Sequence, residues 1–209
     1  MQKVSMEEFG VINIEKLNSL KGGFIYLSRM IDYPTQEILD PKFLEDFKKN
    51  YPETAHKDEL IEIINAMQVY SLEEIKTHYV SLFELNNRYT LYMTYYKMTD
   101  SRERGQVLAK LKMLYEMFGV QIEGTELSDY LPLMLEFLTY SDWKDDYRQQ
   151  DLKLLFSVIE DGTYNLLEKS EEQSDDLYFR TVSIIRSEMR TCVEQPEMKQ
   201  SDATKAGGE

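Results

Sequence analysis

Residues 128–140, SDYLPLMLEFLTY, give the strongest indication of the fold in this sequence. Apolar side chains recur on almost every face of a helix drawn through it, and a helix that is hydrophobic all round is buried. Ser128 belongs to the residue types that cap helix N-termini, and Pro132 suits a first helical turn. We therefore expect a central core helix here, with the other elements packed around it.

Amphipathic helices are predicted on both sides of this central stretch. Apolar residues at spacings of three and four indicate a helix over 15–33 that ends before Pro34. Gly22 and Gly23 lie inside that helix and weaken the prediction locally. The other predicted helices cover residues 35–52, 57–70, 71–83, 88–98, 100–118, 145–160 and 175–193.

Several helix ends carry capping signals. Ser71 and Glu74 have the spacing of a capping box, and so have Asp100 and Glu103, with aspartate in the cap position. Gly119 is placed to end the helix over 100–118, since glycine readily adopts the left-handed conformation of a C-cap.

Two of the predicted helices rest on weaker signals. The segment 88–98 is rich in tyrosine and could be a strand, but no hairpin turn follows it, so we predict a helix. The helix over 145–160 is expected to stop at Asp161 and Gly162.

The pattern as a whole predicts an all-α fold, a single-domain helical bundle of about eight or nine helices over residues 1–193. Residues 194–209 show no periodicity, and we expect a disordered acidic and polar C-terminal tail. A chain of 209 residues suffices for one domain that buries about 70% of its unfolded surface.

The formal net charge of −14 repels nucleic acid and anionic membrane surfaces. A charged partner should therefore be basic, unless the acidity serves solubility alone. No apolar run approaches the ~20 residues that span a bilayer, and the first ten residues lack the pattern of a secretory signal. Cys192, the single cysteine, allows no internal disulfide. We expect a cytoplasmic protein that binds no nucleic acid and does not insert into a membrane.

Few residues are arranged for catalysis. His56 and His78, the two histidines, do not have metal-ligand spacing. The chain has no glycine-rich phosphate loop, no nucleophile elbow and no Cys-x-x-Cys motif. We therefore expect neither an enzyme nor a bound cofactor.

One enzymatic alternative stays open. Asp142, Asp145 and Asp146 are spaced so that their carboxylates could share one helix face and hold Mg²⁺, as in helical enzymes that act on diphosphates. The alternative interpretation is a solvated acidic turn with Trp143 packed underneath.

Aromatic and charged residues concentrate between residues 79 and 105. Glu84 and Arg88 stand four apart, which permits a salt bridge on one helix face. Phenolic rings offer an apolar face together with a hydroxyl that needs a partner. The aromatic residues are Tyr79, Phe83, Tyr89, Tyr92, Tyr95 and Tyr96.

A structural polar network is predicted at the start of the helix over 100–118. Arg102 and Arg104 lie in its first turn, where the positive end of the helix dipole disfavours cations. Asp100, Glu103 or a carboxylate from another helix could compensate. Gly105 would then give a neighbouring group the clearance to come close.

Four stretches together resemble the nitrate reductase delta-subunit family, NarJ-type assembly chaperones within the wider group of TorD-like helical chaperones. They are LSRMIDYP at 27–34, YVSLFELNNRYTLYMTYY at 79–96, DSRERG at 100–105 and ELSDYLPLMLEFL at 126–138. The resemblance covers roughly residues 20–165. Glu84 replaces the usual aspartate, Thr99 a common glycine and Ser128 a frequent proline.

The resemblance implies a dedicated chaperone with no known reaction of its own. Such proteins bind the cofactor-free catalytic alpha subunit of respiratory nitrate reductase in the cytoplasm, chiefly through its N-terminal segment. They keep it competent for insertion of the molybdenum bis-guanine-dinucleotide cofactor and delay its docking on the membrane subunit. A chaperone for another molybdoenzyme and an unrelated helical scaffold remain alternatives, and the chain could act as a monomer or a dimer.

We expect the client segment to bind as an amphipathic helix on a concave, tyrosine-rich surface. Carboxylates near that surface would attract basic residues of the segment. The residues predicted to bind this partner are Tyr79, Phe83, Glu84, Arg88, Tyr92, Tyr96, Asp129, Tyr130 and Glu136.

Overall fold

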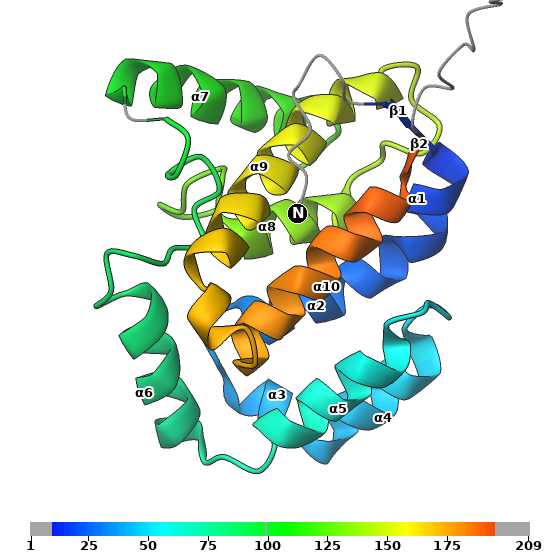
Figure 1. Cartoon of the computed structure of the whole chain (residues 1–209). Helices are drawn as coiled ribbons and strands as arrows, with labels where there is room; N and C mark the ends of the chain where they lie inside the picture. The colour runs from blue at the N-terminus through cyan, green and yellow to red at the C-terminus, as the bar shows by residue number, and fades with distance from the viewer. Residues whose placement is uncertain (1–9, 99, 195–209) are drawn as a thin grey trace, which may run out of the picture.

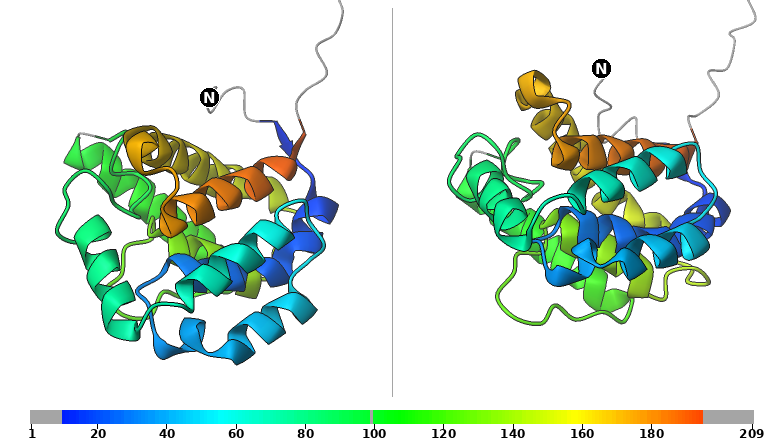
Figure 2. Two further views of the ribbon diagram at one scale, coloured as in Figure 1. Left: turned by 60° about the horizontal axis from the view of Figure 1, so that its bottom comes forward. Right: turned by 90° about the horizontal axis from the view of Figure 1, so that it is seen from below.

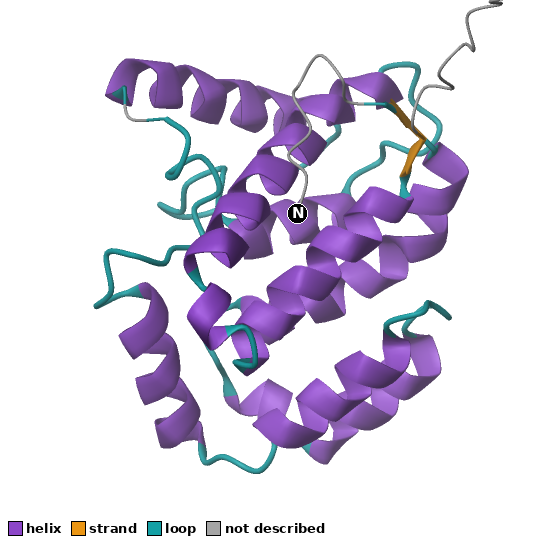
Figure 3. Cartoon of the chain, in the orientation of Figure 1, coloured by secondary structure: helices purple, strands orange, loops and turns teal. Residues whose placement is uncertain are grey.

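The computed structural model describes residues 10–98 and 100–194, and within these it confirms the predicted all-α fold (Figure 1; Figure 3). The α-helices are α1 (Ile14–Leu20), α2 (Phe24–Ile31), α3 (Gln36–Leu39), α4 (Pro41–Asn50), α5 (Lys57–Met67), α6 (Leu72–Phe83), α7 (Ser101–Met117), α8 (Leu131–Tyr140), α9 (Lys153–Lys169) and α10 (Leu177–Thr191). Short 3-10 turns are η2 (Lys21–Gly23), η3 (Gln149–Leu152) and η4 (Glu171–Gln173). Among the described residues, no helix is both long and apolar enough to cross a bilayer.

A two-stranded antiparallel ladder joins the two ends of the described chain. β1 (Val11–Ile12) pairs with β2 (Val193–Glu194), with Val11 opposite Glu194. The Asn13 amide donates to the Cys192 carbonyl at 2.8 Å and continues the contact into α1. Glu194, the first residue of the tail predicted over 194–209, is paired in β2, and the rest of that tail lies outside the described residues, as does Thr99.

Helix α8 occupies the centre of the core, as its all-round apolar pattern predicted. Leu131, Met134, Leu135 and Leu138 are fully buried, and α2 packs along it. Helix α10 packs against α2, α5 and α9 (Figure 1), whereas α6 and α7 lie at the periphery (Figure 2). The three helices α2, α8 and α10 thus form the middle of the bundle.

The predicted helix over 15–33 is divided at its glycines. It forms α1, the 3-10 turn η2 and α2. A Cβ on Gly23 would lie 3.0 Å from the Tyr51 ring and 3.0 Å from the Pro52 ring, so glycine lets α2 approach the end of α4 closely.

The segment 88–98 is not helical, which corrects the prediction. The Met93 amide donates to the Asp129 carbonyl and the Leu131 amide to the Leu91 carbonyl, both at 2.9 Å. These long-range bonds, made around a bridge between Tyr92 and Tyr130, replace the bonds that a helix would form internally.

The predicted cap at Ser128 is also wrong. Tyr130 stands at the N-cap position of α8 and makes no side-chain capping bond, while Pro132 does lie in the first turn. The Ser128 hydroxyl donates instead to the Leu108 carbonyl of α7 at 2.8 Å. The Ser128 hydroxyl therefore ties the loop before α8 to α7 instead of capping α8.

Other predicted helix ends are confirmed. Ser71 and Glu74 form both bonds of a capping box at the start of α6. The Asp100 carboxylate caps α7 by accepting from the Arg102 amide at 2.7 Å, although Asp100 and Glu103 do not form the predicted capping box. Gly119, with φ of +80°, follows the C-terminal residue of α7 in the left-handed conformation.

Two glycines have roles opposite to those predicted. Gly162 does not stop a helix, since α9 continues through it to Lys169. A Cβ there would lie 2.6 Å from the Met93 Cβ, so Gly162 allows segment 88–98 to approach α9. Gly105 was expected to give clearance to a neighbour, yet nothing lies within 4 Å of the Cβ that it lacks.

Alanine at these two glycines should therefore change stability in opposite directions. Gly162→Ala forces the Met93 backbone away and should lower the free energy of unfolding by about 1–3 kcal/mol. Gly105→Ala adds a better helix former at an open position and should raise it by up to ~1 kcal/mol. Urea unfolding followed by circular dichroism measures both, and a destabilised Gly105→Ala would contradict the open surroundings.

Candidate functional site

A cluster of aromatic rings joins α6 to α10. The Phe83 ring lies 5.7 Å from the Tyr178 ring and 6.0 Å from the Phe179 ring, measured between centroids. The Tyr79 ring packs against both, 5.6 Å from the Tyr178 ring and 5.1 Å from the Phe83 ring. We call Tyr33, Tyr79, Phe83, Tyr89, Tyr178 and Phe179 the aromatic cluster.

Tyrosine hydroxyls connect this cluster to α8 and α2. The Tyr79 and Tyr130 hydroxyls lie 2.9 Å apart, and the Tyr130 hydroxyl donates to the Asp32 carboxylate at 2.8 Å. Burial raises the pKa of both tyrosines above their ordinary value. Burial also raises the pKa of half-buried Glu136, and the nearby Asp32 carboxylate adds to the effect. Three predicted partner-binding residues therefore lie near the partly desolvated carboxylate of Asp32. They are Tyr79, Tyr130 and Glu136.

The buried carboxylate of Asp129 organises a second polar network. Asp129 is 0% exposed, and its Oδ2 atom accepts from the amide and hydroxyl of Thr94. The Arg104 guanidinium lies 3.5 Å from the same oxygen and donates to the Thr94 hydroxyl at 3.0 Å. The first-turn arginine thus meets a carboxylate from the segment before α8. Arg102, by contrast, is exposed.

The remaining predicted tyrosines make separate contacts. The Tyr92 hydroxyl donates to Glu126 at 2.8 Å, and burial together with this bond raises its pKa to about 12. The Tyr96 hydroxyl accepts from the Thr90 amide at 2.7 Å. Tyr96 also lines a hollow of about 580 Å³ with Arg104, Gly105 and Lys169.

Glu84 and Arg88 do not form the salt bridge that their spacing permitted. Helix α6 ends at Phe83, so the two residues no longer share a helix face. Arg88 instead lies 3.9 Å from Glu172, beside the connection between α9 and α10.

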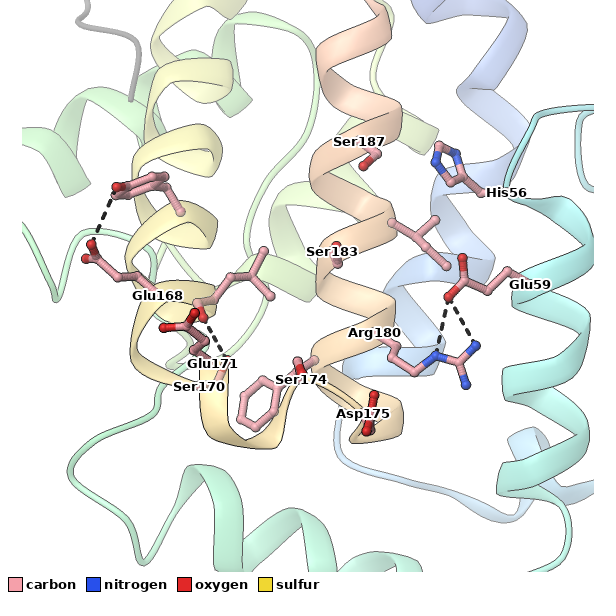
Figure 4. Close-up of a pocket in the computed structure, with 14 residues that line it drawn as sticks. His56, Glu59, Glu168, Ser170, Glu171, Ser174, Asp175, Arg180, Ser183 and Ser187 are labelled. Carbon is pink, nitrogen blue, oxygen red and sulfur yellow. Dashed lines mark hydrogen bonds and ion pairs between the residues drawn. The ribbon is translucent and has the colours of Figure 1, made fainter. Parts of the chain in front are cut away.

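A groove of about 660 Å³ opens between α9, α10 and the start of α5 (Figure 4). Phe179, Ile184 and Leu167 supply its apolar lining. The rim carries four carboxylates against two potential cations, and one of these, Arg180, is held by Glu59 at 3.1 Å. We call this the α9–α10 groove; its rim residues with ionisable side chains are His56, Glu59, Glu168, Glu171, Asp175 and Arg180.

This groove was not predicted from the sequence. One face of α10 carries residues spaced four apart, namely Phe179, Ser183 and Ser187. This face therefore has one aromatic ring followed by two small hydroxyl side chains. That spacing was the available signal. It produces a groove only because α9 and α5 flank the same face of α10 (Figure 4).

The three aspartates of the enzymatic alternative do not act together. Asp146 is bound by Arg148 at 2.6 Å, which lowers its pKa to about 2, while Asp142 and Asp145 are exposed. Trp143 is fully buried and donates to the Leu138 carbonyl at 2.9 Å. Within residues 10–98 and 100–194, no three potential ligands form a metal site. The geometry matches an acidic turn over a buried tryptophan.

Comparison with known proteins gives a consistent result. Residues 48–161 match the family model described as nitrate reductase delta subunit. A probable nitrate reductase molybdenum cofactor assembly chaperone, NarJ of Bacillus subtilis, is 30% identical over 167 residues, or 78% of this chain and 85% of that protein. NarJ of Escherichia coli K12 is 30% identical over 120 residues, or 54% and 50% of the two chains. The nitrate reductase-like protein NarX of Mycobacterium tuberculosis is 38% identical over 66 residues, or 32% and 10%.

The fold is that of an all-helical protein, and two of these relatives are named as nitrate reductase molybdenum cofactor assembly chaperones. The chain belongs to the nitrate reductase delta subunit family.

Two arginines of one helical turn should differ sharply in their effect on stability. Arg104→Ala leaves the buried Asp129 carboxylate without its cation, which costs about 3–5 kcal/mol for a fully buried pair. We expect about 2 kcal/mol, since the Arg104 side chain is 26% exposed. Arg102→Ala, the matched control at an exposed position, should stay within ~0.5 kcal/mol of the parent. Equal losses in urea unfolding would contradict this network.

Alkaline pH should destabilise the fold through the buried tyrosines. In the folded state the pKa values of Tyr79 and Tyr130 exceed the unfolded value of 10.0. The stability that their neutral, buried hydroxyls contribute is therefore fully present below pH 10 and is lost as the pH rises above 10. We expect the free energy of unfolding to fall above about pH 10. Tyr130→Phe should reduce that slope by up to about 1.4 kcal/mol per pH unit. Urea unfolding between pH 8 and 11 tests this, and an unchanged slope would count against burial of the hydroxyl.

Proposed function

We propose that the protein is an assembly chaperone for a respiratory nitrate reductase. It binds the cofactor-free catalytic alpha subunit, mainly through the N-terminal segment of that subunit, and acts in the cytoplasm. The observation that carries the proposal is family membership with a NarJ relative aligned over 78% of the chain. The relative is named for molybdenum cofactor assembly of nitrate reductase, and we extend this role to the present chain.

The α9–α10 groove is the proposed seat of the client segment. A lining that is partly apolar, together with a rim rich in carboxylates, suits an amphipathic helix that carries basic residues. The net charge of −14 attracts such a segment over a longer range and raises its rate of association.

The nine residues predicted to bind the partner include both buried and exposed side chains, which would have different roles. Tyr79 and Asp129 are buried, so we propose that they brace the surface from within. Glu84 and Arg88 are exposed and would contact the client directly. Phe83 would connect the buried residues to the groove, because its ring packs against Phe179, which lines the groove.

The proposed chaperone cycle requires only binding and release. While the N-terminal segment occupies the groove, the alpha subunit stays open for cofactor insertion and does not dock on the membrane subunit. The chain itself supplies no cofactor and performs no reaction. Insertion then changes the client, and its mature fold withdraws the segment from the groove.

Co-purification identifies the client. The tagged protein should capture the nitrate reductase alpha subunit from nitrate-respiring cells, and deletion of its gene should leave that subunit without molybdenum cofactor. Capture of a different molybdoenzyme would change the assigned client. Normal cofactor loading of every molybdoenzyme after deletion would refute a chaperone role.

Charge reversal at the groove rim should weaken client binding. Calorimetry with a synthetic peptide of the alpha-subunit N-terminal segment should show at least a tenfold loss of affinity for Glu168→Lys combined with Glu171→Lys. The control combines Glu116→Lys with Glu123→Lys, which changes the net charge equally at exposed positions away from the groove. Equal losses in both variants would mean that net charge, not the groove, determines affinity.

A further inference from the structure

A second hollow lies on the other side of the α9–α10 connection. It encloses about 400 Å³ between α5, α6 and the first turn of α10. Its lining is largely apolar and its rim is acidic. The lining residues used below are Ala66, Tyr70, Glu74, Asp175, Asp176 and Tyr178, and we call this the α5–α6 hollow.

Exposed apolar side chains adjoin this hollow. Val69 is 82% exposed and Tyr70 is 50% exposed, on the connection between α5 and α6. Single exposed apolar residues are ordinary on protein surfaces, but these two extend a hollow that is already apolar. Together they form a surface on which a further apolar side chain would be shielded from water.

The two hollows are parts of one continuous surface. Asp175 borders both of them. The consecutive residues Tyr178 and Phe179 face apart, Tyr178 into the α5–α6 hollow and Phe179 into the α9–α10 groove. Phe83 packs against both rings, so α6 holds the wall between the hollows. A single bound segment can therefore reach both.

The charge between the hollows identifies the partner further. Asp176 is engaged by His78 and caps α10. Asp175 is exposed and has no hydrogen-bond or ion-pair partner among the described residues. Glu74 adds a further carboxylate at the rim. An unpaired carboxylate between the partly apolar α9–α10 groove and the largely apolar α5–α6 hollow fits a lysine or arginine between two apolar residues.

We propose that the α5–α6 hollow is a second subsite for the same client segment. It takes a large apolar side chain of the segment while the α9–α10 groove takes another, and Asp175 binds a basic residue between them. This inference rests on the proposed function, since the segment is that of the nitrate reductase alpha subunit. The partner chemistry is thus a basic segment with two separated apolar anchors.

A filled hollow tests the second subsite. Ala66→Trp places an indole in the α5–α6 hollow from a partly exposed position. The matched control, Ala109→Trp, makes the same change at an exposed position in a different hollow of about 250 Å³ beside α7. With the synthetic alpha-subunit peptide, calorimetry should show at least a tenfold loss for Ala66→Trp and none for Ala109→Trp. Parent-like affinity of Ala66→Trp would overturn the proposal.

A charge variant keeps the test independent of folding. Asp175→Asn is conservative and exposed, and should weaken peptide binding about threefold to tenfold, whereas Asp145→Asn should not. If Asp175→Asn binds like the parent, the basic residue does not lie between the hollows.

The peptide itself provides the last comparison. Alanine at either apolar anchor should weaken binding to the parent, but alanine at the anchor for the α5–α6 hollow should have no added effect in Ala66→Trp. Loss of affinity at only one peptide position would overturn the second subsite and leave the proposed function intact. A parent protein that does not bind the peptide would refute the client segment itself. If Ala66→Trp changes only the oligomeric state in sedimentation, the hollow binds a second copy and the proposal is wrong.

Discussion

The buried carboxylate of Asp129 is the constraint on which the local architecture depends. A carboxylate removed from water needs hydrogen bonds and a counter-charge, and Thr94 and Arg104 supply both to Oδ2 from two other parts of the chain, while Oδ1 is buried with no hydrogen-bond partner among the described residues. The Asp129 carbonyl also accepts a hydrogen bond from the Met93 amide. The side chain and the backbone of Asp129 together therefore hold segment 88–98 against the start of α8. This arrangement places the adjacent Tyr130 hydroxyl where Tyr79 and Asp32 can reach it.

Contacts that begin at Tyr130 continue through α6 to the surface of the protein. Tyr79 is tied to α8 by its hydroxyl and packs against Tyr178, while Phe83, one turn along α6, packs against Tyr178 and Phe179. Helix α6 is peripheral (Figure 1), yet these ring contacts fix the wall between the two hollows. The tyrosines that dominate this part of the sequence are thus mainly structural, and they determine the shape of a surface that other residues line.

An acidic surface of this kind suits a protein that binds rather than reacts. Its carboxylates are distributed around a partly apolar groove and a largely apolar hollow, and Asp146, one of the three aspartates considered as metal ligands, is already bound by Arg148. Basic segments would be attracted by the rim and retained by apolar contact. Exposed ion pairs contribute little affinity individually, so the apolar anchors would supply most of the affinity and the carboxylates the choice of partner.

The sequence by itself determined the features that depend on neighbours along the chain. The apolar pattern of 128–140 identified the central helix, and Ser71, Asp100 and Gly119 identified helix ends, because periodicity and capping are local. Tertiary structure alone decided that segment 88–98 is not helical, that α9 continues through Gly162, and that Arg104 meets Asp129. In each case the deciding partner lies at least ten residues away, and a hydrogen bond or close approach to it outweighs local propensity. The two hollows have the same origin, since no single helix contains them and they exist only where α5, α6, α9 and α10 meet.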